Sequence, residues 1–397
     1  MFLLLFTPGG CLISALAQGP VPVELQAPGD SYSFGWSLAA SGNTLVVGAP
    51  GGSQSPGSAF VFANERGRWV QVAALTASDG ANFDFFGLSV GVSGDTVVVG
   101  APEHTVGANS QQGAVYVFVK PASGWGDMTE TAELTSADGL AGDRLGYSVA
   151  VDGGTVVTGA ANATLGGNIY QGAAYIFLQP SSGWTTMSQY KAKLTASDGS
   201  SAAHFGWSIA INKNTLVVGA YDANCCGSAY VFVKPTKGWS DSTQTAELNA
   251  SDGASYDFFG WAVAISGQTI CVGADQFNLP ASGKAYVFQE SSQGWANMTQ
   301  TAELTPSDGV PFENFGISVS ISGPAIAVGA TYDSSTPGAA YVFLQPPGGW
   351  INETQNKKLS AHNVSSNSFF GQSVLVGGAI FAGAPFTDTG AGAVYFF

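Results

Sequence analysis

The pattern of apolar and polar positions along this chain repeats seven times, at intervals of 52 to 60 residues. Each copy begins with an aromatic residue or leucine followed by glycine, continues as alternating small and apolar residues, and reaches a Gly-Ala pair. The first glycines of the copies are Gly35, Gly87, Gly146, Gly206, Gly260, Gly316 and Gly371. A repeat this regular predicts an array of similar structural units before any chemistry is considered.

Each copy divides into short segments whose apolar residues alternate with a period of two, which is typical of β-strands. In the fifth copy we expect strands over residues 259–265, 269–274, 285–288 and 301–304. Apolar residues at helical spacing are missing from residues 21–397. Four antiparallel strands repeated seven times predict an all-β fold, a seven-bladed β-propeller that forms one domain over residues 21–397.

The two ends of the chain indicate how the ring closes. The last copy stops at its third strand, residues 394–397, and so lacks a fourth. Residues 21–25 match the fourth strand of a complete copy in register. We therefore expect the N-terminal strand to complete the last blade, which would also cover two strand edges.

The phrases Phe-Gly-x-Ser-Val and Val-Val-Gly-Ala-Pro, at residues 86–90 and 98–102, resemble the FG-GAP repeats of the integrin α-chain propeller. The resemblance extends over residues 21–397, with Leu145 replacing the aromatic residue in the third copy. It implies a recognition or adhesion module with a protein partner.

Family blades often carry a calcium loop between their first and second strands. Here those connections are short hairpin turns, which cannot supply the six to eight or so oxygens that calcium requires. We therefore expect no calcium site of the family type and no cofactor.

A weaker metal candidate is a pair of acids in the loop that leads into the first strand of a blade, called here the lead-in loop. The pairs are Asp79 with Asp84, Asp138 with Asp143, Asp252 with Asp257, and Asp308 with Glu313. Asp before Gly commonly caps a turn through its own backbone. Two copies also lack the second acid, so we favour a structural interpretation and predict no metal site.

Aromatic residues gather at the predicted mouth of the central channel. The first strand of a blade lies innermost, so the residue after each Phe-Gly should face the axis; four of these are aromatic, namely Trp36, Tyr147, Trp207 and Trp261, the hub residues. In integrin α-chains the matching position contributes to a cage for a basic side chain, so the resemblance implies a site for Arg or Lys of another protein. Packing around the axis is the alternative.

The lead-in loops add weaker ligand-binding candidates around the same mouth. They are Phe83, Phe85, Tyr256, Phe258 and Phe312. Variable loops on a rigid scaffold commonly carry recognition. Because aromatic rings beside polar groups also suit sugar faces, lectin-like carbohydrate binding competes with binding of a protein.

Composition and processing signals predict a secreted or cell-surface protein. The net charge is −15 with 12 basic residues, which disfavours nucleic acid and anionic membrane surfaces as partners. Residues 1–17 form an apolar segment ending in Ala-x-Ala, typical of a secretory signal peptide, and no other segment could insert into a membrane. Candidate N-glycosylation sites are Asn162, Asn249, Asn297, Asn352 and Asn363. Attachment to a larger surface assembly stays open.

Residue types that commonly carry catalysis form no constellation in the sequence. The histidines, His104, His204 and His362, fall in different blades, without metal-ligand spacing. Cys225 and Cys226 could form a vicinal disulfide or two free thiols, and Cys271 is expected to be a buried strand residue. We predict a protein that is not an enzyme. A glycosidase or lyase built from two loop carboxylates is the weaker alternative.

Overall fold

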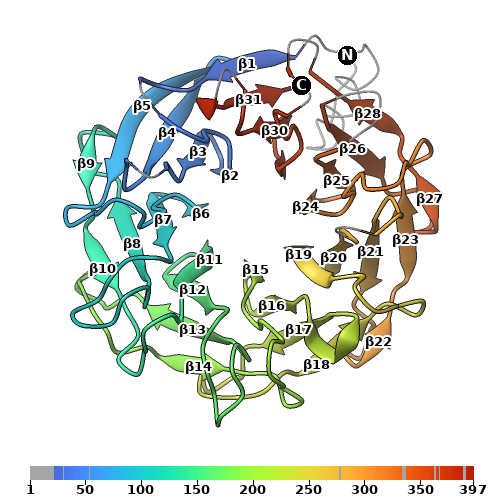
Figure 1. The fold of residues 1–397 in the computed structure, drawn as a ribbon, viewed down its shortest axis with the longest axis horizontal. Helices are drawn as coiled ribbons and strands as arrows, with labels where there is room; N and C mark the ends of the chain where they lie inside the picture. The colour runs from blue at the N-terminus through green and yellow to red at the C-terminus, as the bar shows by residue number, and fades with distance from the viewer. Residues whose placement is uncertain are drawn as a thin grey trace, which may run out of the picture.

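The structure is a computed structural model that describes residues 22–29, 31–52, 54–276, 279–332, 337–361, 364–365, 367–387 and 390–397. These residues form seven small sheets arranged as a ring around a central axis (Figure 1). The prediction of an all-β, seven-bladed propeller is therefore confirmed. The predicted signal peptide, residues 1–17, lies outside the described residues.

The first strand of each blade lies nearest the axis and the later strands lie successively farther out (Figure 1). The inner three strands of the blades are, from blade 1 to blade 7, β2 (Ser37–Ser41), β3 (Thr44–Ala49) and β4 (Ser58–Glu65); β6 (Ser89–Ser93), β7 (Thr96–Ala101) and β8 (Ala114–Val119); β11 (Leu145–Asp152), β12 (Thr155–Ala160) and β13 (Ala173–Leu178); β15 (Ser208–Asn212), β16 (Thr215–Ala220) and β17 (Ser228–Val233); β19 (Phe259–Ser266), β20 (Thr269–Ala274) and β21 (Lys284–Gln289); β24 (Ser318–Ser322), β25 (Ala325–Ala330) and β26 (Ala339–Leu344); and β29 (Ser373–Val376), β30 (Ile380–Ala384) and β31 (Ala393–Phe396).

The fourth strands complete the blades at the outer rim. In blades 1 to 6 they are β5 (Arg68–Thr76), β10 (Ala132–Leu134), β14 (Ala192–Leu194), β18 (Ala246–Asn249), β23 (Ala302–Thr305) and β28 (Lys357–Leu359). A short 3₁₀ turn, η1 (Ala223–Cys225), lies in the loop between β16 and β17. Within the described ranges, no helix has the length and apolarity needed to cross a bilayer.

Three blades gain a fifth strand that the sequence pattern does not predict. The two-residue strands β9 (Met128–Thr129), β22 (Met298–Thr299) and β27 (Glu353–Thr354) each pair in parallel with the fourth strand of the preceding blade. These segments are too short to show any periodicity. They join neighbouring blades at the outer rim.

The chain ends close the ring as expected. Strand β1 (Val23–Gln26) pairs antiparallel with β31, and Leu25 lies opposite Val394. Blade 7 thus takes its fourth strand from the N-terminal segment. The side chain of Leu25 is buried, so this closing strand contributes to the core.

The aromatic residue of each Phe-Gly pair anchors a blade core. Phe86, for example, is 1% exposed, and its ring centroid lies 5.4 Å from that of Tyr116 and 6.1 Å from that of Phe118 on the third strand. Leu145 fills the same position in blade 3 and is also fully buried. The Phe-Gly repeat therefore encodes packing within each blade.

The glycines of the repeat bring neighbouring blades into backbone contact. A Cβ atom on Gly100 would lie 2.0 Å from the carbonyl oxygen of Gly146 in the next blade, and one on Gly383 would lie 1.9 Å from that of Gly35, across the ring closure. Equivalent clashes, at 1.9 to 2.1 Å, arise at Gly48, Gly159, Gly219, Gly273 and Gly329. No side chain fits at these positions, which explains why Gly-Ala recurs at a fixed distance from Phe-Gly.

A serine hydroxyl completes this contact in six of the seven blades. The Oγ–H group donates to the carbonyl oxygen of the next blade's Phe-Gly glycine at 2.7 to 2.9 Å, from Ser37, Ser89, Ser148, Ser208, Ser318 and Ser373. Blade 5 carries Ala262 in the same register, opposite Gly273. The blade 5–blade 6 contact is therefore short of one hydrogen bond.

Replacing a contact glycine should destabilise the ring strongly. Because the backbone of Gly146 cannot move away without shifting a blade, we expect Gly100→Ala to cost about 3 kcal/mol or more of unfolding free energy. Gly126→Ala is the matched control, since its Cβ would meet nothing within 4 Å. Urea denaturation of both variants measures the difference. Equal stabilities would contradict the proposed role of the glycine contact.

Supplying the missing serine should stabilise the protein. Ala262→Ser places a hydroxyl where Ser208 bonds the next blade, so we expect a gain of about 0.5–1.5 kcal/mol. Ser208→Ala should lose a similar amount. Thermal melting of the two variants checks both signs. A loss of stability in Ala262→Ser would mean that blade 5 has no room for this bond.

Candidate functional site

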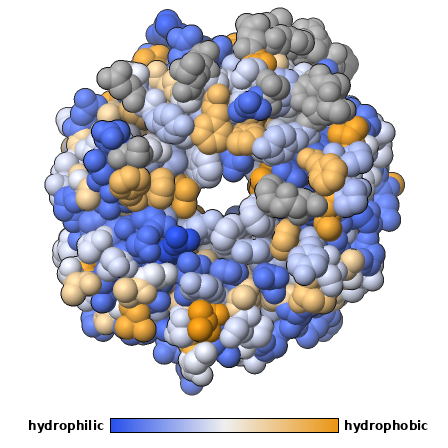
Figure 2. All heavy atoms as spheres, viewed as in Figure 1, coloured by the Kyte–Doolittle hydropathy of each residue, from blue (hydrophilic) through white to orange (hydrophobic). Residues whose placement is uncertain are grey.

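A cavity of about 480 Å³ opens at the mouth of the ring between blades 1, 2, 3 and 7. Its walls come from lead-in loops, from the residues after Phe-Gly, and from the loops that follow Gly-Ala. The lining residues are Tyr32, Ser33, Trp36, Pro50, Gly51, Gly52, Phe83, Phe85, Leu88, Pro102, Glu103, Tyr147 and Phe386. Figure 2 shows the opening at the centre of the ring, with apolar residues on parts of its rim.

The four hub residues fall into two groups. Tyr147, Trp207 and Trp261 stand in a row, with ring centroids 4.4 Å and 4.8 Å apart. Trp36 contacts Phe386 instead, at 6.1 Å. Of the four, Trp36 and Tyr147 line the cavity. Trp207 and Trp261 contact other aromatic rings, so they support the wall to which Tyr147 belongs.

Tyr221 and His204 extend this aromatic row, although the sequence did not single them out as partners of the hub. Tyr221 lies 4.5 Å from Trp207 and 5.1 Å from Trp261, and its ring stacks on that of His204 at 5.1 Å. Burial raises the pKa of Tyr221 to about 12 and lowers the pKa of His204, so both side chains are neutral near pH 7. The sequence feature that could have identified Tyr221 as a residue of the channel mouth is its position directly after a Gly-Ala pair.

The lead-in loop aromatics differ in what they contact. Phe83 and Phe85 line the cavity, and Phe83 is 54% exposed. Phe258 packs 6.1 Å from Trp261 and also contacts Tyr256. Phe312 is 52% exposed and is not among the cavity-lining residues.

All five lead-in aromatics have a left-handed backbone conformation. Their φ angles lie between 55° and 71°, in a region that bulky residues rarely occupy and that costs on the order of 1–3 kcal/mol. The positive φ belongs to the loop itself, because Ala202 adopts it at the position of Phe83 and Arg144 at the position of Phe85 in other blades. Placing phenylalanine there directs an aromatic ring outward at a cost in backbone strain.

Glu103 gives the largely apolar cavity one acidic wall. Its carboxylate forms an ion pair with the Arg144 guanidinium, with 2.8 Å between the Oε1 and Nη2 atoms. Glu103 and Arg144 line a second, adjacent cavity of about 430 Å³, which has Glu103, Phe83 and Phe85 in common with the first. The two cavities therefore meet at one acid and two aromatic rings, and the Arg144 guanidinium belongs to the second cavity.

The paired acids of the lead-in loops have structural partners. The second acid accepts a hydrogen bond from the backbone three residues earlier, as Asp84 does from the Ala81 N–H at 2.8 Å. The first acid accepts a tyrosine hydroxyl from the third strand, as Asp79 does from Tyr116 at 2.9 Å. The equivalent bonds at Asp143, Asp257 and Glu313, and at Asp252 and Asp308, follow the same pattern.

Two of the candidate glycosylation sites occupy a structural position. The Oδ1 atom of Asn297 accepts the Glu247 backbone N–H at 2.9 Å, and Asn352 accepts that of Glu303 at 2.8 Å, so each ties its segment to the preceding blade. Asp127 and Asp241 accept the equivalent bond in other blades. An asparagine at this position is therefore explained without a glycan.

Of the other three candidate sites, the two that the structure describes are not fully exposed. Asn162 and Asn249 are half-buried, and Asn249 already bonds Ser228 and Glu247. Asn363 lies outside the described residues. Use of the sequons stays a prediction.

Asn297→Asp should keep the bond between blades while removing the sequon. In protein made without glycosylation we expect unchanged thermal stability for Asn297→Asp and a loss of about 1 kcal/mol for Asn297→Ala. Mass spectrometry of protein from a glycosylating host then shows whether Asn297→Asp removes a glycan. Equal melting temperatures for the Ala and Asp variants would contradict the structural role.

Within the described part of the chain, Cys225, Cys226 and Cys271 are free thiols. The Sγ atoms of Cys225 and Cys226 lie 2.7 Å apart in the loop at η1, and Cys271 is fully buried as predicted. Burial raises the pKa of the Cys226 thiol to about 11. The Cys226 thiol therefore stays protonated near neutral pH.

The seven similar blades, with a cavity at the mouth of the ring, define the protein as a β-propeller built from repeats. Comparison with known proteins gives its family. Six segments match the FG-GAP repeat, at residues 28–62, 69–118, 128–177, 189–232, 242–288 and 298–343. Since these segments cover more than half of the chain, the protein belongs to the FG-GAP repeat family.

The chain is also similar to a known protein, integrin alpha-7 of Rattus norvegicus. It is 30% identical over 136 residues, which amount to 32% of this chain and 12% of the relative. The aligned part is thus a small fraction of that protein's length.

Proposed function

We propose that this protein is a secreted or cell-surface recognition module that binds a basic side chain of an extracellular protein in the cavity between Trp36 and Tyr147, without catalysis. The observation that carries the proposal is the cavity itself. It brings two hub residues, two lead-in phenylalanines and the Glu103 carboxylate to one place. Membership of the FG-GAP family, with a similarity to an integrin α-chain, supports an adhesive or recognition role.

The chemistry of the lining favours a cation joined to an apolar stem. Aromatic faces attract a cation by about 0.5–2 kcal/mol, and more where water is excluded. Glu103 adds a carboxylate that an incoming ammonium or guanidinium could share with Arg144. The net charge of −15 would speed the approach of a basic partner at low salt.

The size and position of the cavity also suit an inserted side chain. Ligand pockets in proteins commonly span about 300–1,000 Å³, and this one lies within that range at 480 Å³. It opens between loops carried by four rigid blades, so a partner can contact the surrounding loops while one residue enters. The exposed ring of Phe83 stands at this boundary.

Binding should depend on Phe83 and not on its counterpart Phe312. Both rings are lead-in aromatics with positive φ and similar exposure, 54% and 52%, but Phe83 lines the cavity. Wild type, Phe83→Ala and Phe312→Ala serve as baits in the extracellular fraction of the source organism. We expect one protein to be retained by wild type and Phe312→Ala, and reduced at least tenfold with Phe83→Ala.

The retained material distinguishes the alternatives. Elution by free arginine amide or by raised salt supports a basic protein ligand, because both compete for the same aromatic and acidic groups. Elution by soluble glycans would replace the proposal with a lectin. Turnover of a glycan by the protein would replace it with an enzyme. Equal retention by all three baits would place the binding surface elsewhere.

A further inference from the structure

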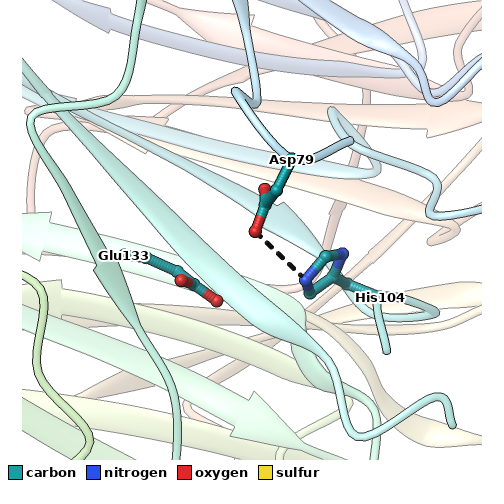
Figure 3. A group of neighbouring side chains, drawn as sticks. All are labelled: Asp79, His104 and Glu133. Atoms are coloured by element: carbon teal, nitrogen blue, oxygen red, sulfur yellow. Dashed lines mark ion pairs between the residues drawn. The ribbon is translucent and has the colours of Figure 1, made fainter. Parts of the chain in front are cut away.

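A second cluster of polar side chains lies in blade 2. Asp79 of the lead-in loop, His104 of the β7–β8 loop and Glu133 of β10 converge on one point (Figure 3). One nitrogen or oxygen atom from each of the three lies within 4.8 Å of the other two. The cluster therefore combines an imidazole with two carboxylates.

The imidazole is enclosed and held in a fixed orientation. His104 is 7% exposed, and its Nδ1 lies 2.8 Å from the Asp84 carboxylate. Its Nε2 faces Asp79, 3.5 Å from Oδ2. A histidine whose Nδ1–H is bonded to a carboxylate, with Nε2 directed at other ligands, has the orientation that metal-binding histidines adopt.

In other blades a lysine ammonium group lies at the matching place. In blade 5, Asp252 and Glu303 match Asp79 and Glu133, and the Lys284 ammonium contacts both, at 3.0 Å from Glu303. Ala114 stands at the position of Lys284 in blade 2, so this ammonium is missing there.

In blades 3 and 6 a lysine from another position neutralises the first lead-in acid. Lys193 and Lys358 replace the outer-strand glutamate and pair with Asp138 and Asp308, at 2.9 Å and 2.6 Å. The blade geometry thus accommodates positive charge at this point. In blade 2 both acids remain, because Glu133 and Ala114 stand where the other blades carry lysine.

We propose that Asp79, His104 and Glu133 bind one divalent transition-metal cation of the Zn²⁺ or Mn²⁺ type, with Asp84 orienting the imidazole. One imidazole and two carboxylates suit these ions, since Ca²⁺ and Mg²⁺ prefer oxygen ligands throughout. The ligand atoms must approach slightly, because bonds of about 2.0–2.2 Å place neighbouring ligands on the order of 3.3 Å apart. The Asp79 side chain is 47% exposed on a loop and can make this movement.

The site is separate from the family's calcium loops, which would lie in the hairpins between first and second strands. It does include Asp79 of a lead-in acid pair, for which the sequence predicts no metal, because His104 and Glu133 come from other segments. It is also independent of the proposed ligand cavity. The two are nevertheless adjacent, since Asp84 lies between Phe83 and Phe85 and His104 follows Glu103.

Metal titration of four proteins tests the site. The purified protein is treated with EDTA and titrated with MnCl₂ and with ZnCl₂, by calorimetry and by the electron paramagnetic resonance of free Mn²⁺. Wild type should bind one equivalent. Glu133→Lys copies the lysine of blades 3 and 6, and Asp79→Asn removes a charge from an exposed side chain; each should weaken binding at least tenfold.

The matched control is Glu247→Lys, the same change at the equivalent position of blade 4. There Asn224 and Ser228 donate to Asp198 and Glu247, so neutral groups satisfy the acids. This variant should bind like wild type, and both should melt at a higher temperature with metal than without it. Mn²⁺ also separates this site from Cys225 and Cys226, because thiolates do not favour it.

Two results would overturn the proposal. One is the absence of saturable binding near one equivalent in wild type. The other is an unchanged affinity in Asp79→Asn and Glu133→Lys, with circular dichroism showing both to be folded. Should Glu133→Lys fail to fold, Asp79→Asn decides the question alone.

Discussion

The ring depends on the contact between two glycines, one from each of two neighbouring blades. Any side chain at the Gly-Ala glycine would meet the carbonyl oxygen of the next blade's Phe-Gly glycine at about 2 Å. This contact sets how closely the inner strands approach, and it recurs across the closure between Gly383 and Gly35. The buried Phe, the glycine and the serine of the repeat thus serve one junction, repeated around the axis.

The junction fixes the scaffold and leaves the loops above it free to differ. The same left-handed lead-in position holds Phe83, Gly142, Ala202, Tyr256 or Phe312 according to the blade. Because the backbone already accepts this conformation, changing the side chain alters the surface without altering the fold. A cavity forms where large rings from blades 1, 2, 3 and 7 face one another, and it is therefore a property of particular copies.

The first lead-in acid likewise has one partner that several blades share and another that varies from blade to blade. A tyrosine hydroxyl on the third strand bonds the first lead-in acid in several blades, as Tyr116 and Tyr286 show. What balances this acid varies among lysine, amide and imidazole. Lys284 and His104 occupy this role in blades 5 and 2, but an imidazole held by a second carboxylate has chemistry that an ammonium lacks.

The sequence by itself determined the parts of the structure that depend on local pattern. Alternation gave the four strands of a blade, the spacing of Phe-Gly and Gly-Ala gave seven copies, and the unpaired segment around Leu25 gave the closure. These features can be predicted from the sequence because strand periodicity and close glycine packing constrain every copy alike. The candidate positions around the channel mouth were also legible, since they share one place in the repeat.

Tertiary structure alone decided which of those positions meet. It separated Trp36 from Trp207, gathered Asp79, His104 and Glu133 from three segments, and added the two-residue strand β9 to the preceding blade. Such contacts depend on the angle between blades and on the course of each loop, to which residues far apart in the chain contribute. A repeat pattern constrains what all copies have in common, whereas a site arises where particular copies differ.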